Sequence, residues 1–465
     1  MKTYKVRIWG IRKRNSKANP FQVRWVVNGE KFGEPYATRT LADARRSQLV
    51  TATKNGEPFD VATGLPVSEL REASSPTWYE HACAYARMKW PGAAGKHRAS
   101  VAESLAAVTA HLVSTRRGAP NRDVLRRALR VYAFQFRIDP ETGDPVSRAV
   151  AEELPPEIGS ALEWLATNSL KVADVAESDV LRGALRDLSK KLDGTPAADN
   201  TVRRKHSVLS NAFKYAIERD LLSSNPLKRI DWKPPATSDE VDFQYVPGPA
   251  QVAELLEAVR ESGTRGGHLH AFFACMYYAA MRPSEVANLK RLACKLPDTG
   301  WGELILSKSR PEVGTGWTDD GKPYEERGLK RRARNATRPV PIPPALVTLL
   351  RTHIDAYGAA PDGRLFRGIR GGRVPSTEYS EIWKDARALA LTAEDLATPY
   401  ADVPYSLRHA GVSLWIKAGV DPVEVARRAG HSPAVLWKFY AKILRGHQDA
   451  SNRMIDAALT SEEES

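Results

Sequence analysis

Alternation of apolar and polar residues near the start of the chain predicts a small sheet. Two segments follow the two-residue period of a strand, and Asn28-Gly29 is a hairpin signal that leads into a third strand. A helix fits the segment that begins at Thr40. The strands are expected at residues 4–9, 21–27 and 31–36, and the helix at residues 40–51.

From residue 77 to about residue 230 the apolar positions follow a helical period instead. Residues 201–222 are the clearest case, because their apolar side chains fall on one face: Val208, Leu209, Ala212, Phe213, Ala216, Ile217 and Leu221. The first half of this helix also carries Arg203, Arg204 and Lys205. These residues are candidates for contacts with a DNA backbone, and an ordinary solvated face explains them equally well.

The last part of the chain mixes helices with two strands. The segment 268–281 is apolar nearly all round and is expected to be buried. The pattern therefore predicts a multidomain protein that is mainly α with small β-sheets. Helices are expected at residues 251–262, 268–281, 343–357, 376–391, 405–418, 421–429 and 432–444, and strands at residues 303–308 and 337–342.

Two stretches rich in Gly, Pro or Ser divide the chain into parts. The first covers residues 56–76, and the second contains Pro234, Pro235 and Pro247. The predicted organisation is a sheet domain at 1–55, a linker at 56–76, a helical domain at 77–233, a linker at 234–247, a mixed domain at 248–446 and a tail at 447–465.

Charge points to a polyanionic partner. The chain of 465 residues has a net charge of +14 and an isoelectric point near 9.6. Residues 1–46 hold twelve Lys or Arg against three acids, so the surplus is concentrated in the small sheet domain. A strand ribbon can enter a DNA major groove, and a capping sheet with a solvated face is the alternative. The candidate DNA contacts here are Lys5, Arg7, Arg12, Lys13, Arg14, Lys17 and Arg24.

Cysteine usage and hydropathy indicate where the protein works. Cys83, Cys275 and Cys294 are far apart and lack metal-type spacing, which disfavours a disulfide framework and fits a reducing cytosol. The sequence has no apolar run of about 18 residues and no apolar core near Met1. We therefore expect a cytoplasmic protein that makes no use of a membrane.

Four residues in the mixed domain can hold and attack one phosphodiester. Arg282 directly follows the buried helix, in Ala-Met-Arg-Pro-Ser-Glu, with Glu285 placed to pair with it. Arg408 precedes His431 by 23 positions, and Tyr440 follows nine positions later. An arginine fork binds two phosphate oxygens at once, whereas a structural Arg–Glu pair or a core tyrosine would explain each residue taken alone.

These residues resemble the tyrosine recombinase (phage integrase) family. Residues 403–444 are similar to its second conserved box, including Gly419 and Gly430-His431-Ser432, and residues 278–290 to its first. The resemblance implies that Tyr440 attacks phosphorus to give a 3′-phosphotyrosyl link, while Arg282, Arg408 and His431 hold the phosphate. It also implies that no cofactor and no metal is needed.

The family's layout and partners are implied in the same way. An arm-type DNA-binding domain, a helical core-binding domain and a catalytic domain would follow one another along the chain. The implied protein is an integrase of a phage or integrative element that binds double-stranded DNA at core and arm sites. It would assemble as a homotetramer on paired sites, with an excisionase or other directionality factor as a further candidate partner.

The sequence departs from the family pattern at Tyr405. A histidine usually stands three residues before this arginine, and a phenol cannot carry an imidazolium charge. His409 lies within one turn of Tyr405 and is a further candidate base, although histidine after the arginine is common in the family.

The family's lysine, which protonates the 5′-oxygen, is assigned here to Lys330, with Lys308 as the rival. A basic tract that only contacts phosphates is the alternative for both lysines. In the same tract Arg331, Arg332 and Arg334 are candidate DNA contacts.

Three other functions compete with the recombinase. A type IB topoisomerase would use the same residues to cut and reseal one DNA, and a second, basic DNA-contacting domain argues against it. A DNA-binding regulator that has lost chemistry is favoured by Tyr405 alone. A zinc nuclease would need more than His268 and His270, which lack carboxylates at ligand spacing.

Overall fold

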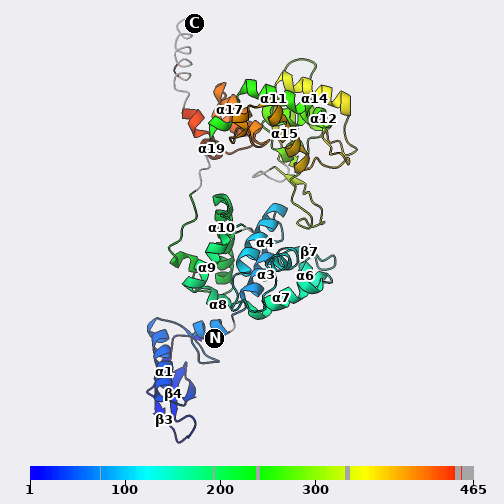
Figure 1. The fold of residues 1–465 in the computed structure, drawn as a ribbon. Coiled ribbons are helices and arrows are strands. Elements are labelled where there is room, and N and C mark those ends of the chain that lie inside the picture. The colour runs from blue at the N-terminus through cyan, green and yellow to red at the C-terminus, as the bar shows by residue number, and fades with distance from the viewer. Residues whose placement is uncertain (74, 192–193, 237–240, 330–335, 446–451, 453–465) are drawn as a thin grey trace. The chain divides into compact units, whose positions relative to one another are not determined.

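The structure is a computed structural model that describes the chain except residues 74, 192–193, 237–240, 330–335, 446–451 and 453–465 (Figure 1). As the sequence pattern predicts, the fold is mainly helical with small antiparallel sheets. The chain forms two compact units, Met1–Ala236 and Thr237–Ser465. None of the helices in the described segments has the length and apolar character needed to cross a membrane.

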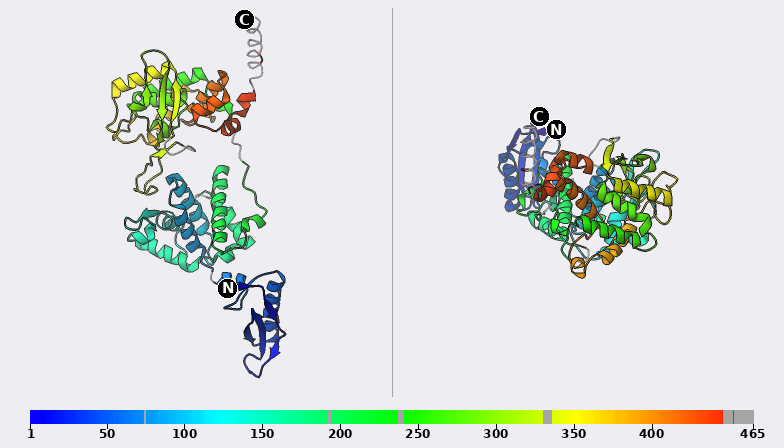
Figure 2. Two further views of the ribbon diagram at one scale, coloured as in Figure 1. Left: turned by 180° about the vertical axis from the view of Figure 1, so that it is seen from behind. Right: turned by 90° about the horizontal axis from the view of Figure 1, so that it is seen from above.

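The first unit begins with a small sheet. In both β2 and β4 the residues alternate between more and less buried positions, and α1 packs along the sheet (Figures 1 and 2). Thr38 caps α1 by accepting a hydrogen bond from the amide of Leu41. The elements are β1 (Lys2–Thr3), β2 (Val6–Ile8), β3 (Arg12–Lys13), β4 (Phe21–Val27), β5 (Glu30–Tyr36), α1 (Arg39–Lys54), β6 (Phe59–Asp60) and α2 (Val67–Ala73).

The three predicted strands are present as β2, β4 and β5. A further short strand that was not predicted, β3, pairs with β4 along the same edge as β2, while β5 pairs with the opposite edge. Asn28 and Gly29 both have positive φ, as the predicted hairpin turn between β4 and β5 requires.

The stretch from 56 to 76, predicted to be a linker, is instead largely folded. It contains β6, which pairs with β1, and α2. Phe59 is fully buried in the same core as Val23, Trp25 and Leu49. The prediction failed because Gly and Pro here punctuate short elements that pack on the sheet, a pattern that resembles a linker when each residue is read alone.

The remainder of the first unit is helical. Its elements are α3 (Trp78–Lys89), α4 (Gly95–Thr109), α5 (Arg122–Arg127), the π-helical segment η1 (Ala128–Ala133), β7 (Phe136–Ile138), β8 (Pro145–Ser147), α6 (Arg148–Ala151), α7 (Pro156–Asn168), α8 (Val172–Val175), α9 (Ser178–Leu188), α10 (Asp199–Glu218) and the 3₁₀ turn η2 (Pro226–Arg229). The amphipathic helix predicted at 201–222 is α10, which packs its apolar face on α3, α4 and α9.

The second unit surrounds the buried helix α12. In sequence order its elements are η3 (Phe243–Tyr245), α11 (Pro249–Glu261), α12 (Gly266–Tyr278), α13 (Pro283–Val286), η4 (Arg291–Ala293), β9 (Cys294–Lys295), β10 (Gly302–Leu306), β11 (Lys308–Ser309), β12 (Arg327–Gly328), β13 (Arg338–Ile342), α14 (Pro344–Tyr357), α15 (Ser376–Ala390), α16 (Ala393–Leu396), α17 (Ser406–Lys417), α18 (Pro422–Ala429) and α19 (Pro433–Arg445). Because α12 is apolar nearly all round, it can pack on α11, α14 and α17 at once (Figures 1 and 2).

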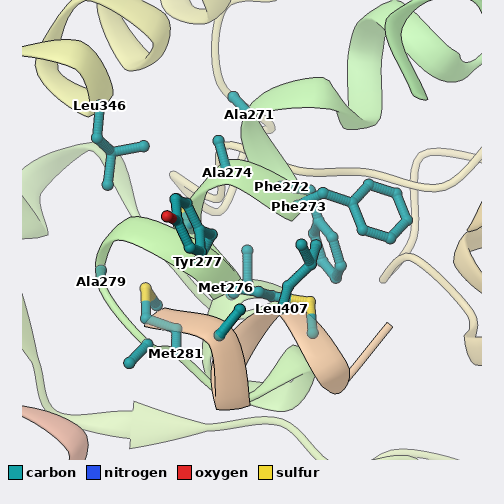
Figure 3. Packing of buried hydrophobic residues seen from close by; sticks show 14 of the residues in the cluster. Ala271, Phe272, Phe273, Ala274, Met276, Tyr277, Ala279, Met281, Leu346 and Leu407 are labelled. Carbon is teal, nitrogen blue, oxygen red and sulfur yellow. The ribbon is translucent and has the colours of Figure 1, made fainter. Parts of the chain in front are cut away.

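This core fixes the segments that carry the candidate chemistry. Leu407 of α17 is fully buried with Phe272, Phe273 and Met276 of α12 in one cluster (Figure 3). Burying large apolar side chains stabilises a fold by roughly 1.5–3 kcal/mol each. Arg408, which follows Leu407, is therefore held against the C-terminal end of α12.

A three-stranded antiparallel sheet, in the order β13-β10-β9, packs beside these helices, and β13 contacts α18. In its register Leu306 lies opposite Arg338. The predicted strand at 303–308 is divided into β10 and β11, and β11 pairs with β12 in a separate small hairpin. The connection between the two predicted strands thus contains a strand pair of its own.

Candidate active site

Arg282 is held where the buried helix ends. The chain turns after α12 at Ala280, whose φ of 44° lies in the left-handed region that non-glycine residues rarely occupy. Arg282 then stands at the N-cap of α13, and Pro283 is the first helical residue, as predicted. Its side chain is 19% exposed, so the guanidinium lies at the edge of the core.

Glu285 is a fully buried carboxylate that holds two arginines. It accepts hydrogen bonds from the backbone amide of Arg282 at 2.9 Å and from Arg282 Nη1 at 3.0 Å. Arg338 at the start of β13 donates to the same carboxylate through both Nη atoms, at 2.8 and 3.1 Å. Although burial alone would raise the pKa of Glu285, the surrounding guanidinium groups lower it to about 2, so the group is ionised.

Arg408 is completely buried on α17 and reaches toward the same place. It donates through Nη1 to the carbonyl of Ala280 and through Nη2 to the carbonyl of Ala429 at 2.6 Å. Nη2 also lies 2.8 Å from His431 Nε2. Burial lowers the pKa of this guanidinium.

His431 follows the left-handed C-cap Gly430 of α18. Gly430 has a φ of 66°, and its carbonyl accepts a hydrogen bond from Arg282 Nη2 at 3.1 Å. A β-carbon at this position would collide with the guanidinium of Arg338, so glycine is required both by backbone and by space. Burial and the charge of Arg408 lower the pKa of His431 to about 3, which leaves the imidazole neutral.

Tyr440 places its phenol ring beside both His431 and His409. Its ring centroid is 6.3 Å from that of His431 and 5.9 Å from that of His409. The hydroxyl lies 2.8 Å from His409 Nδ1. Tyr440 is buried, which raises its pKa, and its backbone (φ −121°, ψ 15°) departs from helical geometry inside α19.

The structure therefore brings Arg282, Glu285, Arg408, His431 and Tyr440 together, as the spacing predicts. Tyr405 stands at the N-cap of α17, where its ring packs against His409 at 5.1 Å and lies under the Arg408 guanidinium at 5.9 Å. His409, the further candidate base, also belongs to the site. Arg338 belongs to it as well, although the sequence analysis did not assign it; its only signal was its place just before a Pro-Val-Pro strand.

Electrostatically, these described side chains form a cationic cluster. The guanidinium groups of Arg282 and Arg338 pair with the carboxylate of Glu285, the charge of Arg408 acts on the same carboxylate, and both histidines are neutral. Arg408 Nε and His431 Nδ1 are buried and have no hydrogen-bond partner among the described residues. Buried charges and polar atoms are normally paired, so the cluster is suited to an anion with several oxygen acceptors.

The lysine assignment is not decided by this geometry. Lys308 and Glu285 line one cavity of about 370 Å³, and Lys308 Nζ pairs with Glu326 at 2.6 Å. Lys330, together with Arg331, Arg332 and Arg334, lies outside the described residues. Of the two assigned lysines, Lys308 is the one that the structure describes, and it shares the lining of this cavity with Lys290.

The predicted DNA contacts in the first unit are exposed except for Arg24, which is partly buried, and Lys205, which is buried. Lys5, Arg7 and Arg12 are exposed, as are Lys13, Arg14, Lys17, Arg203 and Arg204. Lys205 was predicted wrongly: it is buried, and its amine lies 3.5 Å from the carbonyls of Leu188 and Lys190. The position of Lys205 on α10 directs its side chain toward α9, and the run of basic residues 203–205 alone does not show this.

The register of the strands places three of the predicted DNA contacts, Arg7, Arg12 and Arg24, on one face of the N-terminal sheet. Val23, Trp25 and Val27 of β4 point to the core, so Gln22 and Arg24 point away from it. Arg7 pairs with Val26 and Arg12 with Gln22, which puts both arginines on the same open face as Arg24. Arg24 is partly buried and lies over the Trp9 ring at 5.6 Å.

The histidine pair considered for zinc has a structural environment. His268 is buried against His353 and Tyr357, and its Nε2 accepts a hydrogen bond from the amide of Arg367 at 3.3 Å. Within the described residues, no group of three or more His, Cys, Asp or Glu side chains is placed to hold a metal ion.

No protein-family model and no curated protein sequence matches the chain. Solved structures to which it is similar are DNA integrases and site-specific recombinases. The Tn1549 transposon integrase in complex with transposon right end DNA has 20% identity and a TM-score of 0.43, over 55% of this chain and 80% of that one. The XerH site-specific recombinase bound to a palindromic difH substrate has 10% identity and a TM-score of 0.48, over 80% and 95%. A lambda integrase dimer bound to a core site has 13% identity and a TM-score of 0.41, over 90% and 91%. At such identities and TM-scores, these similarities assign no activity to the chain.

Proposed function

We propose that the protein is a tyrosine-type site-specific DNA recombinase, an integrase that cuts and rejoins DNA at attachment sites and thereby integrates or excises a mobile element. One observation carries this proposal. A buried tyrosine lies beside a cluster of three arginines and one carboxylate, in which Arg408 Nε and His431 Nδ1 have no partner among the described residues. A phosphodiester supplies the missing anion, and a phenol is the nucleophile that can attack it.

Each residue has a chemical role in this proposal. Arg282 and Arg408 hold the non-bridging oxygens of the phosphate, and His431 donates a hydrogen bond to it. Tyr440 Oη forms a bond to phosphorus while the bond from phosphorus to the 5′-oxygen breaks. The product is a 3′-phosphotyrosyl link and a free 5′-hydroxyl, which conserves the energy of the phosphodiester for religation.

The open basic face of the N-terminal sheet supports an integrase over an enzyme that only relaxes DNA. Arg7, Arg12 and Arg24 share that face, which offers a DNA contact in a unit other than the one that holds Tyr440. Such a second contact is suited to a protein that binds arm sites as well as core sites. A homotetramer on paired sites and a directionality factor belong to the same proposal.

The proposal is tested by trapping the covalent adduct. Nicked duplexes tiled across the DNA that flanks the gene are incubated with the full-length protein in buffer containing EDTA and resolved on a denaturing gel. The wild type is expected to form an adduct, and Tyr440→Phe to form none while binding DNA with unchanged affinity. Tyr405→Phe is the matched control, since it removes a neighbouring phenol hydroxyl.

Other results would favour other functions. DNA binding without an adduct from any duplex would favour a regulator without chemistry. An adduct with relaxation of supercoiled plasmid but no exchange between two duplexes would favour a topoisomerase. DNA cleavage that leaves no adduct and stops in EDTA would favour the zinc nuclease.

A further inference from the structure

The proton of Tyr440 has a defined neighbour in this structure. The hydroxyl lies 2.8 Å from His409 Nδ1, which is the distance of a good O–H···N hydrogen bond. Because burial raises the pKa of Tyr440, the phenol is protonated at neutral pH and must lose its proton when it attacks phosphorus. His409 Nδ1, at hydrogen-bond distance, can accept this proton.

His409 is held in the orientation that this role requires. Its ring contacts the rings of both Tyr405, at 5.1 Å and 70°, and Tyr440, at 5.9 Å. Its backbone lies in the second turn of α17, where its carbonyl accepts the hydroxyl hydrogen of Ser413 at 2.7 Å. The imidazole is thus fixed on the same helix as Arg408, one turn after Tyr405.

The charge state of His409 also fits a proton acceptor. Burial and the adjacent Arg408 lower its pKa to about 4, so the ring is neutral and Nδ1 can accept the hydroxyl hydrogen. The titratable and charged groups that face it are Arg408, His431, Tyr405 and Tyr440. A phosphodiester bound to the arginines offsets their charge, which makes protonation of His409 easier when DNA is present.

We propose that His409 is the general base of this protein and takes the Tyr440 proton during cleavage. In this step the bond from Tyr440 Oη to phosphorus forms and the bond from phosphorus to the 5′-oxygen breaks. The Oη proton moves to His409 Nδ1, and the leaving 5′-oxygen takes a proton from the ammonium group of the lysine assigned as general acid, Lys330 or Lys308. In religation the 5′-hydroxyl gives its proton back to that lysine, and His409 returns the other proton to Tyr440. His409 thereby supplies the imidazole that Tyr405 cannot.

This inference rests on the proposed function and is tested on the duplex that the wild type cleaves. Single-turnover cleavage is compared for the wild type, His409→Asn and His409→Ala. Asparagine can place an amide oxygen near the Nδ1 position, so it keeps a hydrogen bond to Tyr440 and cannot accept the proton. Both variants are expected to lose about 100- to 10,000-fold in rate, the usual contribution of general acid–base catalysis. Lys417→Gln, which changes an exposed residue of the same helix, is the control and should cleave at the wild-type rate.

A second substrate separates the base from the acid. With sulfur in place of the bridging 5′-oxygen, the leaving group needs no proton, and variants of the general acid recover. His409→Asn is expected to remain as slow on this substrate as on the ordinary one, and to gain rate as pH rises because hydroxide takes over.

Each contrary result has a distinct meaning. Normal cleavage by His409→Asn, with slow cleavage by His409→Ala, would reduce His409 to a positioning residue and overturn the inference. Recovery on the sulfur substrate would make His409 the acid. A wild type that forms no adduct on any duplex would overturn the proposed function itself, and the inference with it.

Discussion

Arg338 and Glu285 form a bidentate ion pair in which both side chains are almost completely buried, 53 residues apart in sequence. The same carboxylate fixes the backbone amide and side chain of Arg282. Arg338 therefore acts on the site through Glu285, as a positioning residue that the spacing of the family motif does not include.

We expect Arg338→Met to destabilise the second unit by about 3–5 kcal/mol, because it leaves a buried carboxylate with one partner fewer. Urea unfolding of the full-length protein, followed by hydrogen exchange of β13 and α13, measures this change. Lys295→Met, which breaks an exposed pair with Glu303, is the control and should cost no more than about 1 kcal/mol. Equal effects from the two variants would contradict the buried-pair account.

Arg408→Lys should slow single-turnover cleavage by about 100- to 1,000-fold, the usual effect of removing one donor to a developing oxyanion. A lysine cannot bond the carbonyls of Ala280 and Ala429 and still present a planar fork to phosphate. Arg428→Lys is the matched control, because Arg428 pairs with Glu424 on the same unit. Wild-type rates for Arg408→Lys would mean that Arg408 serves only to join α17 to its neighbours.

Acid should loosen the second unit in two stages. The pKa values of His409 and His431 are lowered from 6.5 to about 4 and about 3, so below pH 6.5 the unfolded chain binds protons that the folded chain does not. The stability they contribute is present above pH 6.5 and falls by about 1.4 kcal/mol per pH unit for each histidine. The pKa of Glu285 is lowered from 4.5 to about 2, so its contribution is lost later, as pH falls below 4.5.

Hydrogen exchange of α17 at pH 7.5, 6 and 5 measures the first stage. Protection should fall steadily toward pH 5 in the wild type and less steeply in His431→Asn, which lacks one titrating group. If protection falls equally steeply with pH in the two proteins, the pKa of His431 is the same in the folded and the unfolded chain, which would contradict this prediction.

The open face of the N-terminal sheet should contribute to the salt dependence of DNA binding. Replacing Arg7, Arg12 and Arg24 by Gln should reduce the slope of log affinity against log salt concentration by about 2 to 3, if each contacts one phosphate. Lys54→Gln, at the end of α1, is the control. Fluorescence anisotropy with labelled duplexes at several salt concentrations gives the slopes, and an unchanged slope would place the DNA contact elsewhere.

Local rules were sufficient for the parts of the site that are near in sequence. An all-apolar helix followed by Arg-Pro predicted where Arg282 stands, and helical periodicity predicted that Tyr405, Arg408 and His409 share a face. The partner of Glu285 could not be predicted in this way, because β13 reaches it only through the register of a sheet. Lys205 was misjudged for a similar reason, since only the packing of α10 on α9 shows which way its side chain points.

The surplus of positive charge around Glu285 favours one state of the DNA phosphate over another. Three arginines against one carboxylate leave a surplus of two positive charges among these described side chains, before any lysine is counted. A resting phosphodiester carries one negative charge, and the five-coordinate phosphorane formed on attack carries two. The cluster therefore neutralises the phosphorane better than the intact DNA backbone. In the proposed reaction, its arginines would lower the barrier to attack more than they tighten binding of the uncut site.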